Sequence, residues 1–172
     1  MSYGIHCTKK LLDRIKPSTV PDKSASTTYL GDWYATVLFW KPQIALLVNE
    51  RTLLPVLMPL APASELALRF PLHLAAVFAA HGVPQSLIDH ELSQMTEFRY
   101  AKTANRSLVG MLNQFMYLAE GYRDYLESVD LLALSMKLSE TPCSRLYKGA
   151  ISPDRELQKF AAGWHGSVET TQ

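Results

Sequence analysis

The sequence predicts a single α+β domain over residues 1–172, in which a mixed, mostly antiparallel sheet of four to five strands is packed by helices. Three observations predict this class. The chain has 172 residues, which is a usual size for one domain. Apolar runs typical of strands occur in the first 60 residues and again near residue 100. Between and after these runs, apolar residues recur at the spacing of an amphipathic helix.

The chain opens with a pattern typical of a strand followed by a helix. Tyr3 to Cys7 predicts a short strand, and the segment KKLLDRIK predicts a small helix that begins after Thr8 as its N-cap and stops at Pro17. Residues 17–31 are rich in Ser, Thr and Pro and show no periodicity. We expect a flexible loop there.

Three apolar runs come next. WYATVLFW, the turn KPQ and IALLVNE predict two strands of an antiparallel hairpin. TLLPVLMPL predicts a third strand. Because Pro55 has no backbone N–H to donate to a ladder, we expect this third strand at an edge of the sheet or at a bulge.

Helical patterns dominate most of the remaining sequence. They cover residues 62–83, the segment QSLIDHELSQM, residues 130–139 and residues 153–162, and the tail over residues 163–172 is expected to fray. The consecutive residues Asp89, His90 and Glu91 diverge by about 100° each around a helix. They therefore predict a solvated face rather than a metal site.

Residues 97–126 form the central stretch of the chain. Glu97 to Thr103 alternates as a strand, and Asn105 can then cap the longest amphipathic helix. The apolar stripe of that helix consists of Leu108, Met111, Leu112, Phe115, Leu118, Ala119 and Tyr122. Such a stripe predicts that the helix is a principal wall of the core.

The polar corner between this strand and this helix is the candidate site. A helix N-terminus offers unpaired N–H groups and about half a positive charge, which favours an anion. The side chains that could bind the anion are Lys102, Thr103, Asn105, Arg106 and Ser107, with Asn113 farther along the helix. The alternative is that the polar residues only cap the helix and that the cations are solvated. No Gly-rich loop precedes the helix, so a nucleotide-binding P-loop is not indicated.

A second basic corner follows the first predicted strand, at Thr8, Lys9 and Lys10. If the two strands are parallel and adjacent, both corners share one edge of the sheet, and open sheets bind ligands at such edges. His6, at the end of the first strand, is a candidate general acid or base. The alternatives are that His6 is structural and that the two lysines form the solvated face of a helix.

Composition limits the partners that the chain can have. Lys and Arg number 17, Asp and Glu 16, and the formal net charge is +1, so binding of nucleic acid or of an acidic protein needs a local basic patch. Cys7 and Cys143 are too few for a disulfide framework, which favours the cytoplasm. The N-terminus lacks an apolar signal segment, and we expect no membrane partner. No motif indicates a metal or a cofactor, and a homodimer is compatible with the sequence.

Three segments in order carry a resemblance to a known family. They are IHCTKKLLDRIK at residues 5–16, ALLVNERT at residues 45–52 and AKTANRSLVGMLN at residues 101–113. Over roughly residues 4–120 the chain resembles a family of small bacterial and phage-borne proteins catalogued only as a domain of unknown function. The resemblance implies that the two basic corners are the recognisable pattern of the family, and it implies no activity.

Two classes of function are compatible with these features. The first is a binding or interaction module that holds a phosphate-bearing or acidic partner at the basic corners. The second is a hydrolase of a phosphate ester or nucleic acid, in which Lys102 and Arg106 stabilise developing charge and His6 acts as general acid or base. We favour the binding module, because the sequence offers no convincing pair of a base and a nucleophile.

Overall fold

The computed structural model describes residues 1–17, 25–126 and 128–165. The strands are β1 (Ser2–Cys7), β2 (Trp33–Leu38), β3 (Ile44–Asn49), β4 (Pro55–Pro59) and β5 (Glu97–Lys102). The α-helices are α1 (Lys9–Ile15), α2 (Leu66–Ala80), α3 (Gln85–Ser93), α4 (Arg106–Arg123), α5 (Leu131–Ser139) and α6 (Pro153–Gly163), and two short 3-10 helices are η1 (Ala63–Glu65) and η2 (Ser144–Leu146).

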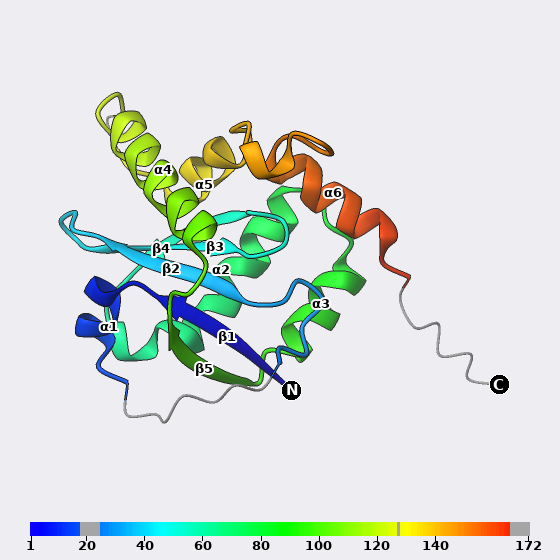
Figure 1. Cartoon of the computed structure of the whole chain (residues 1–172), viewed down its shortest axis with the longest axis horizontal. Coiled ribbons are helices and arrows are strands. Elements are labelled where there is room, and N and C mark those ends of the chain that lie inside the picture. Colours follow the sequence, from blue (N-terminus) through cyan, green and yellow to red (C-terminus); the bar gives the residue numbers. More distant parts are fainter. Residues whose placement is uncertain (18–24, 127, 166–172) are drawn as a thin grey trace.

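One mixed sheet of five strands in the order β4-β3-β2-β1-β5 organises the chain (Figure 1). The pairs β2–β3 and β3–β4 are antiparallel, whereas β1 pairs in parallel with both β2 and β5. The predicted α+β class and mixed sheet are thus confirmed, with the antiparallel pairing confined to the hairpin portion. Pro55 begins the edge strand β4, as its missing N–H donor requires.

Helices cover the two faces of the sheet and bury two separate clusters (Figure 1). The first cluster joins one face of β1, β2, β3, β4 and β5 to α1, α2 and α3, and includes Tyr3, Ile5 and Cys7. The second joins the other face of β2, β3 and β4 to α4 and α5. Because side chains alternate along a strand, Gly4 and His6 of β1 lie on the face of the second cluster, yet neither belongs to it. That face of β1 is therefore available for polar chemistry.

The described part of the predicted flexible loop, residues 25–31, is held by hydrogen bonds. Glu91 accepts the backbone N–H groups of Tyr29 at 2.9 Å and Leu30 at 3.2 Å. Glu91 is only 1% exposed, so the predicted solvated face is wrong at this residue. Burial raises the pKa of Glu91, and the two backbone N–H donors oppose that rise. Residues 18–24 of the same loop lie outside the described residues.

Two further expectations concern α2 and the C-terminal tail. Within the described ranges, one helical segment, Ala63–Ala80, is long and apolar enough to cross a membrane by length and composition, and 33% of it is buried inside the structure. The expectation of no membrane partner stays a prediction. In the predicted frayed tail, Trp164 packs against the first cluster, and residues 166–172 lie outside the described residues.

Candidate functional site

The carboxyl ends of β1 and β5 lie side by side. The two strands are parallel, with Cys7 paired to Lys102, and the backbone N–H of Thr103 donates to the carbonyl oxygen of Cys7 at 3.3 Å. The hypothesis that the two strands are parallel and adjacent is therefore confirmed. Residues 8–10 and 102–107, which leave these two strand ends, are called the shared corner below.

The chain leaves the shared corner in two directions. Leu11 and Ile15 of α1 belong to the first cluster, whereas Leu108 and Met111 of α4 belong to the second, so the two helices cover opposite faces of the sheet. Neighbouring strands whose connections diverge in this way form a topological switch point. In open sheets with parallel strands, ligands bind outside the carboxyl ends of the strands at such points.

The helix caps at the shared corner differ from each other. Asn105 is the N-cap of α4, and its side-chain oxygen accepts the N–H groups of Ser107 at 3.0 Å and Leu108 at 3.2 Å, which confirms the predicted cap. Thr8 occupies the N-cap position of α1, as predicted, but its side chain does not cap the helix. Its hydroxyl instead shares a 3.0 Å hydrogen bond with the hydroxyl of Thr36. Two N–H groups of α4 are thus occupied by its own cap. An anion at this corner would depend mainly on side-chain cations.

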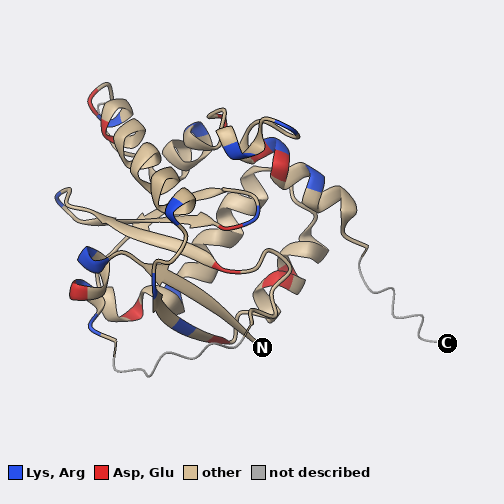
Figure 2. Cartoon of the chain, viewed as in Figure 1, with Lys and Arg blue, Asp and Glu red and all other residues tan. Residues whose placement is uncertain are grey.

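Four cations surround these caps. Lys9, Lys10, Lys102 and Arg106 are exposed, and none of them forms an ion pair with another described residue. Figure 2 shows basic residues on α1, on β5 and at the start of α4, around the same edge of the sheet. Asn113 is exposed but lies seven residues beyond Arg106 on α4, a rise of about 10 Å along the helix. It is the most distant of the predicted site residues.

A polar cluster that the sequence did not predict adjoins the shared corner. Nε2 of His6 lies 2.9 Å from Oδ2 of Asp32, and the guanidinium of Arg99 donates to both oxygens of the same carboxylate at 3.3 and 3.4 Å. The backbone N–H of Gly4 donates to Oδ1 of Asp32 at 2.8 Å. The His6 ring stacks on Tyr34, with ring centroids 4.7 Å apart. We call His6, Asp32 and Arg99 the polar triad.

The register of the sheet assembles the polar triad. Gly4 is paired with Arg99 on β5, and His6 is paired with Tyr34 on β2, so these four residues face the same side of the sheet. Asp32 directly precedes β2 and reaches over Gly4. A Cβ atom at Gly4 would lie 2.8 Å from Oδ2 of Asp32, so only glycine leaves room for the carboxylate.

The electrostatics of the polar triad favour an ion pair. The hydrogen bond to Asp32 raises the pKa of His6, although burial opposes the rise. Burial alone would raise the pKa of Asp32, but the bonds from His6 and Gly4 and the charge of Arg99 lower it overall. Nδ1 of His6 also faces the carbonyl oxygen of Lys102 at 3.4 Å. Since both ring nitrogens face acceptors, the doubly protonated imidazolium satisfies both contacts.

The described residues beside the triad include neither a cluster of metal-ligand side chains nor an accessible thiol. Over residues 1–17, 25–126 and 128–165, no group of three or more His, Cys, Asp or Glu residues could hold a metal ion. Cys7 follows His6 but points into the first cluster on the opposite face, and burial raises the pKa of its thiol to about 12. The site can therefore offer positive charge, hydrogen-bond donors and a proton from His6.

The family described as a domain of unknown function (DUF6933) matches residues 4–156. The match covers most of the chain, so the chain belongs to this family, as the resemblance of the three segments suggested. It extends beyond Tyr122, where the sequence carried no recognisable resemblance. No curated protein and no solved structure matches the chain.

Proposed function

We propose that this member of the DUF6933 family is a binding module whose shared corner holds the phosphate or carboxylate groups of an anionic partner. The parallel register of β1 and β5 carries the proposal, because it brings two basic segments about 90 residues apart in sequence to one edge of the sheet. The divergence of α1 and α4 at that edge supports it further, since ligands of open sheets bind at such switch points.

The charge distribution supports a local rather than a global interaction. The whole chain has a formal net charge of +1, so no general positive field attracts an anion from a distance. Lys9, Lys10, Lys102 and Arg106 instead concentrate charge around one edge. Each exposed contact with an anionic group contributes only about 0.2–1 kcal/mol, so useful affinity requires several contacts together and falls as salt is added.

The experiment that tests this function compares three probes. Fluorescence anisotropy is measured for labelled single-stranded RNA, single-stranded DNA and a poly-glutamate peptide against the full chain, over a series of salt concentrations. Binding that weakens as salt rises supports the proposal, and the probe bound most tightly gives the class of partner. If none of the three binds at low salt, the proposal is contradicted.

A second candidate function is hydrolysis of a phosphate ester, and the contact between His6 and Asp32 favours it. A protonated His6 could donate its proton to a leaving oxygen, while Lys102 and Arg106 stabilise the developing charge. Water would have to be the nucleophile, because the thiol of Cys7 is buried on the other face. The test is turnover of bis(p-nitrophenyl) phosphate by the wild type and by His6→Gln. Equal rates for the two proteins would rule out this role of His6.

A further inference from the structure

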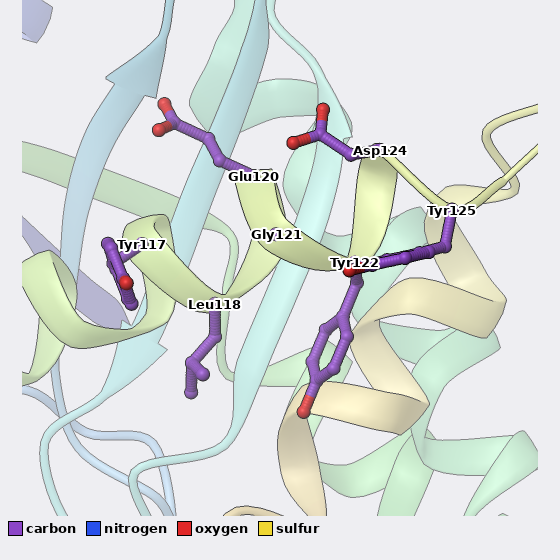
Figure 3. Close-up of a pocket in the computed structure, with 7 residues that line it drawn as sticks. All are labelled: Tyr117, Leu118, Glu120, Gly121, Tyr122, Asp124 and Tyr125. Carbon is purple, nitrogen blue, oxygen red and sulfur yellow. The ribbon is translucent and has the colours of Figure 1, made fainter.

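The last turns of α4 carry a notch around Gly121, far along the helix from the shared corner. Tyr117 lies four residues before this glycine and Tyr125 four residues after it, and their side chains are 78% and 91% exposed. A Cβ atom at Gly121 would meet nothing within 4 Å. A pocket of about 460 Å³ lies here, and Figure 3 shows the tyrosine side chains on both sides of the glycine.

The charged residues that line this notch, Glu120 and Asp124, are both acidic. Glu120 and Asp124 point to one side of the helix in Figure 3, and neither forms an ion pair with another described residue. They lie at the carboxyl end of α4, where the helix dipole is already negative. The faces of the tyrosine rings are also negative, because of the aromatic quadrupole. The combination attracts a cation and repels an anion.

The nearby cations of the chain are engaged with other rings. The guanidinium of Arg123 lies 4.6 Å from the ring centroid of Trp40, and the ammonium of Lys137 lies 5.7 Å from that of Tyr122. In the part of the chain that the structure describes, no cation lies over Tyr117 or Tyr125. The notch thus has two aromatic rings and two carboxylates for a cation that this chain does not supply.

Three features here do not help to stabilise the folded chain. A glycine in the helix weakens it relative to alanine, carboxylates at its carboxyl end oppose the dipole, and two large aromatic rings face water. Such local departures from the rules of stability are expected at functional sites. Their coincidence within nine residues points to a binding role.

We propose that the notch around Gly121 binds a lysine or arginine side chain from a basic segment of a partner protein. Charge complementarity identifies this occupant: the carboxylates pair with the cationic head, and the tyrosine rings pack on it through cation–π contacts. The aliphatic stem of such a side chain also suits the aromatic wall. The inference is independent of the shared corner, which has the opposite charge.

The test measures the anisotropy of labelled peptides in which glycine alternates with lysine, arginine or glutamate. The wild type is expected to bind the lysine and arginine peptides and not the glutamate peptide. Gly121→Ala places a methyl group between the two tyrosines without a steric clash and should weaken binding about two- to fivefold, the scale of a cation–π contact at an exposed site. Glu120→Gln combined with Asp124→Asn, which keeps the shape and removes the charge, should weaken it similarly.

Gly110→Ala is the matched control. Gly110 lies on the same helix, and a Cβ atom there would also meet nothing within 4 Å, so this variant should bind as the wild type does. A thermal melting point for Gly121→Ala no lower than that of the wild type shows that the loss is not caused by unfolding. Unchanged binding in both notch variants, or no binding of basic peptides at low salt, would overturn the proposal. Self-association that Gly121→Ala abolishes would assign the notch to a second copy instead and would also overturn it.

Discussion

The backbone N–H of Thr103 donates to the carbonyl oxygen of Cys7 at 3.3 Å, and this contact joins the ends of two strands that begin 95 residues apart. From Cys7 the chain turns to α1 on one face of the sheet, and from Thr103 it turns to α4 on the other. The two basic segments therefore start from adjacent strand ends. This relationship is the basis of the proposed anion site.

The cap of α4 should contribute measurably to stability. Asn105→Ala removes an acceptor used by two backbone N–H groups, so we expect the free energy of unfolding to fall by about 0.5–2 kcal/mol. Urea denaturation measures the change. Asn113→Ala, at an exposed position within the same helix, is the control and should change stability little. An equal loss in the two variants would contradict the capping role.

The contact between His6 and Asp32 should make stability depend on pH. His6 has a pKa raised above its ordinary value of 6.5, so its contribution is fully present below about pH 6.5 and is lost as pH rises through the folded pKa. Asp32 has a lowered pKa, so its contribution is present above its ordinary value of 3.8 and is lost as pH falls through the folded pKa. The pair should therefore stabilise the fold most in mildly acidic solution.

The measurement is the free energy of unfolding of the wild type and of His6→Gln at pH 6 and pH 9. We expect a deficit in the variant of about 1.5–3 kcal/mol at pH 6, the range for hydrogen bonds to charged groups, and a smaller deficit at pH 9. His165→Gln controls for loss of a histidine at an exposed position. A deficit that grows with pH would contradict the ion pair.

Gly4 should not tolerate a side chain. A Cβ atom there would lie 2.8 Å from Oδ2 and 3.0 Å from Cγ of Asp32, so the carboxylate would have to leave its hydrogen bonds. We expect Gly4→Ala to lower the free energy of unfolding by about 1–3 kcal/mol, the usual cost of overpacking. The same substitution at Gly110 meets no neighbour and should be neutral or stabilising. Chemical denaturation measures the stability of both variants. If Gly4→Ala is as stable as Gly110→Ala, the steric argument is excluded.

Glu91 should be essential for holding residues 29 and 30. Glu91→Ala leaves two backbone N–H groups without their acceptor, and each buried unpaired donor costs about 1–3 kcal/mol. We expect a loss of at least about 2 kcal/mol in urea denaturation, together with faster amide exchange at Tyr29 and Leu30. Asp89→Ala, on the exposed side of α3, should lose much less. If Glu91→Ala is as stable as the wild type, Glu91 does not hold this segment.

Features that depend on neighbouring residues could be predicted from the sequence. The cap at Asn105, the hairpin of β2 and β3, the edge position of β4 at Pro55 and the stripe of α4 follow from local spacing, and the structure confirms them. The adjacency of β1 and β5 was only a hypothesis, because periodicity within a strand does not reveal which strand lies beside it.

Features that depend on register could not be predicted in this way. The polar triad joins His6 to Asp32 and Arg99, which are 26 and 93 residues away in sequence, and only the pairing of β1 with β2 and β5 brings them together. The burial of Glu91 is a different case, because the helical spacing of its own segment indicated it. Glu91 lies four residues after Leu87, on the buried face of α3, and its charged side chain obscured that periodicity.

The most direct test of the anion site is the salt dependence of binding to single-stranded RNA and DNA in a double variant, Lys102→Ala with Arg106→Ala. The matched control is Arg145→Ala with Lys148→Ala, which removes the same charge from exposed positions in and after η2. Circular dichroism establishes that both variants are folded. We predict that the corner variant loses affinity at low salt. The plot of log affinity against log salt should also become less steep, by about 1.4 in slope, because two phosphate contacts are lost. The control variant should keep the affinity and the slope of the wild type. Identical salt dependence in the wild type and the corner variant would contradict the account.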